Sequence, residues 1–465
     1  MVREPVVKKT SQEMLYSAGK QVKRSEIDCI YPTRPSSHVY LPSVNVRNSG
    51  KSGILMSLLR LIPVFCIYFL LVFSPLARGA VQPWSQLVIF MVIVIGIAAF
   101  CISRSLAWDW QWIPTVLDRP ILAGLGLCIL SFLFSVHRSI SLQALILPMA
   151  YLGLFFLIIQ TTVTRRQLRM IVSIILGVAF FLSVFGICKR FGLNPFPWWE
   201  YNELKYKPDF LAATFGNHNH LAGYLEMALP LLLGLFIQQL RLSKLMLLVY
   251  IALLMICAHI LSLSRGGWIA LLLGLTFMAT VLVADRRFKS RKILMFLVVG
   301  LVLGAFIILA STPVVERVKS IMEMEEEASF HSRVVAWQGV YRLISAHPTL
   351  GTGPGTFADV FTQYQPPGLG RRFTMAHNDY LQFIADCGLL VIPLIAWLAW
   401  IFYREGFEKL KTSSRLSRGI CLGAMAGITA ILVHSIIDFN LHIPANAMLF
   451  VVLIALVVMP VPRRS

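Results

Sequence analysis

Charged residues are scarce in this sequence. Only 14% of its 465 residues are Asp, Glu, Lys or Arg, whereas 57% belong to the hydrophobic set AVILMFWYC. Soluble domains carry about 25% charged residues, so this scarcity excludes a soluble globular enzyme, a disordered protein and a collagen-like fibre. Acidic residues are the rarer kind, 22 against 42 Lys and Arg, which gives a net charge of +20. In so apolar a chain we assign the basic excess to cytoplasmic loops beside anionic lipid, and we expect no nucleic-acid partner.

The sequence also lacks the motifs of several enzyme classes. Its eight cysteines form no C-x-x-C pair, and it has no G-x-x-x-x-G-K-[ST], H-E-x-x-H or G-x-S-x-G. These absences disfavour zinc sites, redox sites and P-loop ATPases. No two aspartates are separated by a single residue, and a metal-bound nucleotide sugar usually needs such a pair. We therefore expect no metal and no cofactor, and we disfavour a metal-dependent nucleotide-sugar transferase.

Long apolar runs dominate the rest of the chain. A transmembrane helix needs about 20 mostly apolar residues, and we predict twelve such spans. They are 54–76, 84–102, 119–136, 142–162, 170–188, 220–238, 244–263, 267–284, 293–312, 380–402, 419–436 and 446–461. The predicted fold is all-α, a polytopic integral membrane helix bundle of about 12 transmembrane helices with a large, partly helical periplasmic loop.

The distribution of basic residues predicts the orientation. Residues 1–52 are polar and basic and lack the apolar core of a signal peptide, so we expect a disordered cytoplasmic tail. Lys and Arg recur in alternate loops, and by the positive-inside rule both termini are then cytoplasmic. Residues 53–312 would hold nine spans and an outer loop, 189–219. Residues 313–379 would form the large periplasmic loop, and 380–465 the last three spans.

The first polar cluster on the predicted outer side is Ser264-Arg265-Gly266-Gly267-Trp268. The glycines permit a tight turn, and the Arg265 guanidinium has a geometry that suits two phosphate oxygens. The alternative is that the Gly-Gly pair only makes the hairpin and that Arg265 meets lipid headgroups.

A second cluster lies in a helix predicted over 328–346, which Ser332 would cap. Arg333 would provide a second phosphate contact, and Trp337 would anchor the helix or stack on a sugar. The alternative is an amphipathic helix on the membrane surface, with Arg333 paired to one of the nearby glutamates.

A third cluster precedes the span at 380–402 and contains Arg371, Arg372, His377 and Asn378. Histidine is the side chain best suited to remove a proton near neutral pH, so His377 is the candidate general base. The alternative is an interfacial residue that only ends the helix.

Two further polar groups lie on the same side. Asn217 and Asn219 precede the sixth span, where we expect hydrogen bonds to a sugar or headgroup rather than a metal site. The group His434, Asp438, Asn440 and His442 would either line the same cavity or merely end two spans, and we favour the second interpretation.

The order of these motifs resembles the O-antigen ligase/polymerase superfamily. The resemblance rests on S-R-G-G-W, H-S-R-x-x-x-W, P-T-L-G-T-G-P-G-T-F and A-H-N-D-Y-L-Q within about residues 212–402. It implies a multi-pass glycosyltransferase of the bacterial inner membrane, with its active site facing the periplasm. The expected donor is a glycan on an undecaprenyl-diphosphate carrier. The acceptor would be a hydroxyl of lipid A-core or of the growing polysaccharide, and the expected partners are membrane lipids and polysaccharide assembly proteins.

The resemblance also implies roles for individual residues. Arg265 and Arg333 would hold the diphosphate and His377 would act as general base, with Lys189, Arg190, Arg371 and Arg372 as further phosphate contacts. Two fixed arginines stabilise the departing diphosphate more in the transition state than in the ground state, which would allow inverting, metal-independent transfer. A protein O-oligosaccharyltransferase, a bicarbonate-like transporter, a flippase and a scaffold for polysaccharide assembly remain alternatives.

Overall fold

The computed structural model describes residues 51–162, 164–194, 196, 210–237, 241–284, 300, 313–369 and 372–460, without the side chains of 51–54 and 313–329. Internal contacts divide the chain into Met1–Ser52 and Gly53–Ser465. The predicted disordered tail lies outside the described residues except at its last two positions. In the second unit the described residues form helices and no strands, as the sequence predicts.

Seven helices are long and apolar enough to cross a membrane. They are α1 (Lys51–Leu76, from Leu55 on), α2 (Pro83–Ala107), α4 (Arg138–Thr161), α5 (Arg165–Arg190), α7 (Leu242–Leu261), α8 (Arg265–Ala284) and α14 (Arg415–His434). Helix α15 (Pro444–Val458) is apolar but shorter. The chain is therefore a multi-pass helical membrane protein, but the described residues do not support the count of about 12 spans.

The other predicted spans meet different outcomes. Helices α3 (Asp118–Leu133) and α6 (His218–Leu235) lie at two of them, while 293–312 lies outside the described residues. The span predicted at 380–402 is wrong as one helix, because the chain forms α12 (Asp379–Cys387) and α13 (Val391–Thr412) instead. Gly388 separates them with φ +80°, and a Cβ there would lie 2.1 Å from the Thr349 carbonyl oxygen. Only glycine combines this backbone angle with so close an approach.

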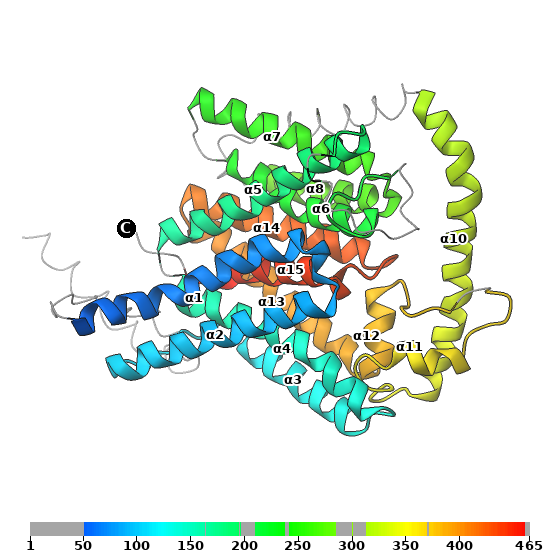
Figure 1. Ribbon diagram of the computed structural model, residues 1–465, viewed down its shortest axis with the longest axis horizontal. Helices are drawn as coiled ribbons and strands as arrows, with labels where there is room; N and C mark the ends of the chain where they lie inside the picture. Colours follow the sequence, from blue (N-terminus) through cyan, green and yellow to red (C-terminus); the bar gives the residue numbers. More distant parts are fainter. Residues whose placement is uncertain are drawn as a thin grey trace, which may run out of the picture. The chain divides into compact units, whose positions relative to one another are not determined.

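Helix α14 occupies the core of the bundle and packs against α6, α8, α13 and α15 (Figure 1). Gly419, Gly423 and Gly427 recur every fourth residue along it. A Cβ on any of them would lie 2.2–2.6 Å from a backbone oxygen of α6. Small residues at this spacing let membrane helices approach closely. The G-x-x-x-G-x-x-x-G pattern was visible in the sequence and predicts this contact, which our sequence analysis missed.

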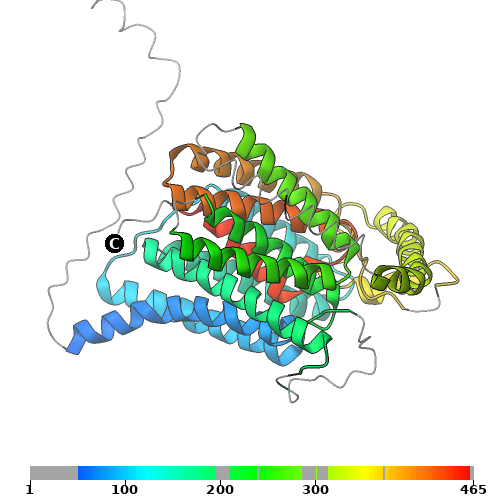
Figure 2. The ribbon, with the colours of Figure 1, turned by 90° about the horizontal axis from the view of Figure 1, so that it is seen from above.

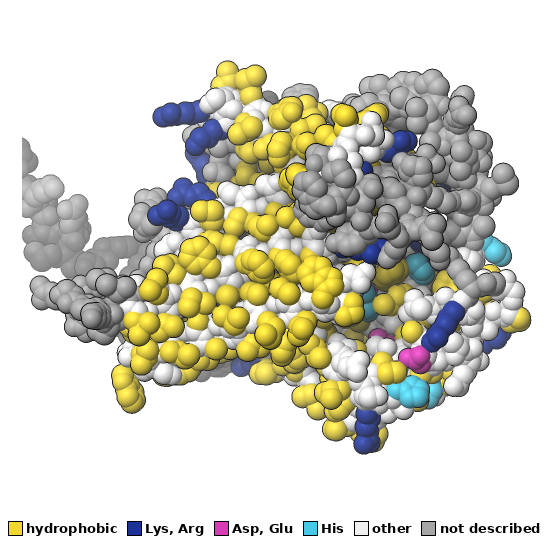
Figure 3. Space-filling model, in the orientation of Figure 1, with side chains coloured by type: hydrophobic (Ala, Val, Ile, Leu, Met, Phe, Trp, Pro, Cys, Tyr) yellow, Lys and Arg dark blue, Asp and Glu magenta, His cyan; other side chains and the backbone are white. Residues whose placement is uncertain are grey.

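Hydrophobic side chains cover the visible sides of the helices (Figure 3). Phe65, Leu87, Met91 and Leu122 are each more than half exposed. Apolar surface of this extent suits contact with lipid rather than water. In the same view the visible histidines lie toward the end of the bundle that carries α10 (Pro313–Ala346), α11 (Phe357–Val360) and α12.

The segment after the predicted ninth span lies at one end of the helices (Figures 1 and 2). Helix α10 (Pro313–Ala346) begins well before residue 328, so Ser332 lies inside it and does not cap it as predicted. Its buried face, including Val340 and Leu343, packs on Phe357 of α11 (Phe357–Val360) and on the adjoining Phe361. The segment thus has a small apolar core of its own, which holds α10 against α12.

The glycine-rich stretch 351–355 joins this segment to the bundle. Gly351, Gly353 and Gly355 all have positive φ. The Val136 amide donates to the Thr352 carbonyl over 3.0 Å, and the Ser131 hydroxyl donates to the Leu350 carbonyl over 2.8 Å. The glycines therefore allow the backbone turns by which this stretch packs between α3, α4 and α12.

Candidate active site

A cavity of about 620 Å³ opens where α6, α8, α10 and the α14–α15 connection meet. Its polar lining consists of His218, Asn219, Arg265, His331, Arg333, His434 and Asp438. Arg265 and Arg333, predicted from separate motifs, therefore line one cavity. Because α6 and α8 both begin at this cavity, their positive N-terminal ends add to its attraction for an anion.

Arg265 is the first residue of α8, and its side chain is exposed. The Ser264 hydroxyl caps the helix by accepting from the Gly267 amide over 3.2 Å. The turn itself is made by Leu263, with φ +56°. The alternative interpretation that the Gly-Gly pair makes the hairpin is therefore wrong, because both glycines lie inside α8. The glycines serve close packing instead, since a Cβ on Gly266 would lie 2.5 Å from Ile437 Cδ1.

Arg333 reaches the cavity from α10. Its Nη1 donates to the Ile437 carbonyl over 2.7 Å. Its Nε is buried and has no hydrogen-bond partner among the described residues. The side chains of the glutamates predicted as alternative partners lie outside the described residues. The guanidinium is thus fixed at one nitrogen while keeping an unsatisfied donor, an arrangement suited to an anionic ligand.

His377 lies beside the cavity, and Asp438 connects the two. Nδ1 of His377 is 3.5 Å from Oδ1 of Asp438, and the His377 side chain is 23% exposed. Its backbone has φ +49°, a conformation that costs energy in a residue with a Cβ. The Trp337 indole N–H donates to the Ala376 carbonyl over 2.8 Å, and the Gln382 Oε1 accepts from the Ala376 amide over 2.8 Å. Trp337 therefore holds the backbone that presents His377.

The electrostatics favour an ionised Asp438. Burial opposes its charge, but the imidazole of His377 and the guanidinium of Arg333 hold the pKa of this carboxyl well below its usual range. The carboxylate thus has a positive group on its cavity side and the candidate base on the other. It is suited to orient His377.

His218 brings a neutral imidazole to the cavity. Its Nδ1 lies 2.8 Å from the Ser262 carbonyl oxygen, and its ring stacks on Phe210 at a centroid distance of 4.4 Å. Burial lowers its pKa to about 4. Since a carbonyl only accepts, Nδ1 carries the proton and Nε2 is left as an acceptor.

The predicted asparagine contacts are mainly helix caps. Asn217 Oδ1 accepts from the Asn219 amide over 2.8 Å, and Asn378 Oδ1 accepts from the Leu381 amide over 3.0 Å. Of the three, only Asn219 lines the cavity. Next to Asn378, the buried Asp379 accepts from the Ser435 hydroxyl over 2.7 Å, which joins α12 to the end of α14.

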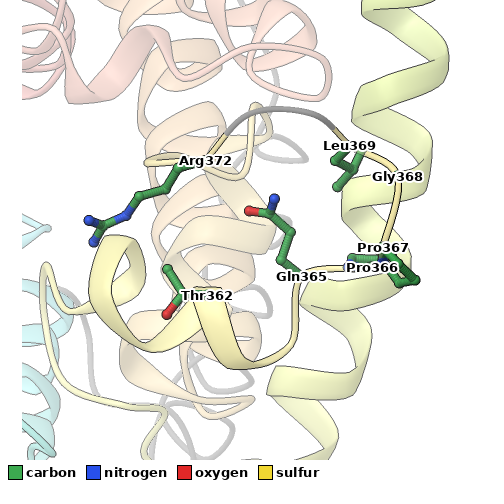
Figure 4. A pocket seen from close by; sticks show the side chains of 7 residues that line it. All are labelled: Thr362, Gln365, Pro366, Pro367, Gly368, Leu369 and Arg372. Atoms are coloured by element: carbon green, nitrogen blue, oxygen red, sulfur yellow. The ribbon is translucent and has the colours of Figure 1, made fainter.

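The other predicted phosphate contacts are not brought to this cavity. Lys189 and Arg190 end α5 and are not among its lining residues, and Arg371 lies outside the described residues. Arg372 donates to the Ala358 carbonyl over 2.7 Å and to Asp359 Oδ1 over 3.0 Å. It lines a different cavity of about 490 Å³ beside the Pro366–Leu369 loop (Figure 4).

Sequence reasoning missed two of the acidic groups that matter. We expected His434 and Asp438 only to end two spans, but both line the cavity. The carboxyl of Glu226 on α6 is fully buried and accepts from His434 Nδ1 over 3.1 Å. A lone acid within an apolar run is a functional signal in membrane proteins, and it would have pointed to Glu226.

Residues 250–398 match the family model described as O-antigen ligase. The matched segment contains Arg265, Arg333 and His377, and it runs from within α7 to within α13. No curated protein matches the chain.

Proposed function

We propose that this chain, which the match over residues 250–398 places in the O-antigen ligase/polymerase superfamily, transfers or polymerises a glycan from an undecaprenyl-diphosphate carrier. The acceptor is a hydroxyl of lipid A-core or of a growing surface polysaccharide. The observation that carries the proposal is that Arg265, Arg333 and Asp438 line one cavity, with His377 beside Asp438.

The proposed reaction is one displacement at the anomeric carbon. The acceptor oxygen forms the new bond while the bond from the sugar to the diphosphate breaks, and the electron pair leaves on the diphosphate. Arg265 and Arg333 stabilise that growing negative charge, with the N-termini of α6 and α8 beside them. Two guanidinium groups in a partly dry cavity supply the stabilisation without a metal ion, and a single displacement inverts the anomeric centre.

His377 takes the proton of the acceptor hydroxyl. With Nδ1–H directed to the Asp438 carboxylate, Nε2 carries the free electron pair needed for a base. Ionised Asp438 also stabilises the imidazolium that forms. Trp337 and Gln382 keep the preceding peptide in place.

We further propose that the cavity faces the periplasm and that both termini are cytoplasmic. The alternation of basic loops supports this orientation. Charged groups at the opposite end of the bundle include the buried Lys409, whose Nζ donates to the Leu456, Val457 and Met459 carbonyls. In this orientation Lys409 lies on the cytoplasmic side.

Glycan transfer by the purified protein tests this function. The full chain in lipid nanodiscs receives an undecaprenyl-diphosphate glycan and an acceptor glycan, and mass spectrometry follows both products. We expect longer glycan and free undecaprenyl diphosphate, lost in His377→Ala and kept in His137→Ala, which alters an exposed histidine outside the site. Substrate flux across proteoliposomes with no change in glycan would instead indicate a transporter.

A further inference from the structure

The interior of the bundle holds a pair formed by a carboxylate and an imidazole. Nδ1 of His434, at the end of α14, lies 3.1 Å from both carboxylate oxygens of Glu226 on α6. The two residues are 1% and 0% exposed. Removing two such groups from water is costly, and apolar side chains of similar size would often stabilise the fold as well or better. Their presence among apolar helices therefore calls for a role beyond packing.

The pair is directed at the cavity. His434 is one of the lining residues, together with Arg265 and Arg333. Because Glu226 occupies Nδ1, the opposite edge of the ring is the one available to a ligand. That edge faces Gly266, where a Cβ would lie 3.1 Å from both Nε2 and Cδ2 of His434. Gly266 lets the first turn of α8 pack closely on this edge, since a Cβ there would also lie 2.5 Å from Ile437 Cδ1, and Nε2 therefore lies one residue from Arg265.

We propose that His434 is a third diphosphate-binding group, which donates from Nε2 into the cavity beside the start of α8, and that Glu226 is its positioning residue. The Glu226 carboxylate fixes the ring through Nδ1 and stabilises its doubly protonated form, in which Nε2–H is a donor. The inference rests on the proposed function, because it assigns a further contact to the same leaving group.

Binding of a soluble analogue tests the inference without the transfer reaction. The probes are farnesyl diphosphate and farnesyl monophosphate, titrated into the purified full chain in detergent. A hydrogen bond to a charged group contributes about 1.5–3 kcal/mol, so we expect His434→Gln and Glu226→Gln each to weaken diphosphate binding about tenfold or more. The monophosphate should lose less, because it presents fewer oxygens to the three donors.

Gly266 provides an independent arm of the test. Gly266→Ala places a methyl group beside Nε2 and should weaken diphosphate binding in the native background. In His434→Ala the same substitution should change the affinity little, because the contact is already gone. If the Glu226–His434 pair is purely structural, its variants should lower the melting temperature and leave the ratio of diphosphate to monophosphate affinity unchanged.

The controls separate this inference from the proposed function. His259→Gln removes another buried imidazole, on α7, that does not line the cavity, and it should retain the affinity.

If Arg333→Ala weakens diphosphate binding while folded His434→Gln and Gly266→Ala bind like the native chain, the role of His434 is refuted and the proposed function stands. If Arg333→Ala also binds normally, the proposed function itself fails. Should Glu226→Gln not fold, His434→Gln and Gly266→Ala decide alone.

Discussion

Nδ1 of His377 lies 3.5 Å from Oδ1 of Asp438, across a contact between the α12 start and the α14–α15 connection. Asp438 also lines the cavity shared by Arg265 and Arg333. One carboxylate thereby links the candidate base to the candidate phosphate-binding residues. Under the proposed function, Asp438 would set where the acceptor hydroxyl meets the leaving group.

Asp438→Asn should slow glycan transfer about a hundredfold or more, because the amide keeps the shape but neither stabilises an imidazolium nor fixes the ring tautomer. The measurement is kcat under saturating donor and acceptor. In a His377→Ala background the same change should cost much less. Equal losses in both backgrounds would show that Asp438 does not act through His377.

Trp337→Phe should reduce kcat about fivefold while leaving the KM for the donor nearly unchanged. The substitution removes the N–H that holds the Ala376 carbonyl, a hydrogen bond contributing about 1 kcal/mol. The matched control is Trp400→Phe, which alters a tryptophan that is 69% exposed on α13. A raised KM with normal kcat would indicate instead that Trp337 binds the sugar.

His218 predicts a pH dependence of stability. Burial lowers its pKa from 6.5 to about 4. At a pH between these two values the imidazole is largely protonated in the unfolded chain and neutral in the folded chain. Stability must then decrease as pH falls from about 6.5 toward 4. We expect the melting temperature to fall over this range, and to fall less in His218→Gln. Identical pH dependence of the two proteins would contradict a neutral His218 in the folded chain.

Gly423→Ala should lower the melting temperature by several degrees, because its Cβ would lie 2.5 Å from the Pro230 carbonyl oxygen and separate α14 from α6. Gly126→Ala on α3 is the control, since a Cβ there meets nothing within 4 Å. Alanine is also the better helix former, so the control should be unchanged or slightly more stable. Equal effects at both positions would refute the close packing.

The sequence predicted the helical membrane architecture, because apolar run length is a local property of the chain. It also led to Arg265 and Arg333, which the fold brings to one cavity. It did not reveal Glu226–His434 or His377–Asp438, since each pair depends on how distant helices pack. The close packing at Gly266 and Gly388 likewise involves residues that are distant in the sequence, so no local pattern predicts it.

The central claim is that two arginines together stabilise a departing diphosphate, and a double-mutant cycle on Arg265 and Arg333 tests it most directly. Glycan-transfer rates are compared for the native chain, Arg265→Ala, Arg333→Ala and the double variant, with Arg104→Ala as a control at a distant Arg–Asp pair. We predict losses of about 10²–10³-fold for each single variant, and a double loss smaller than their product because both groups act on one leaving group. Folded single variants that transfer glycan at the native rate would contradict the account.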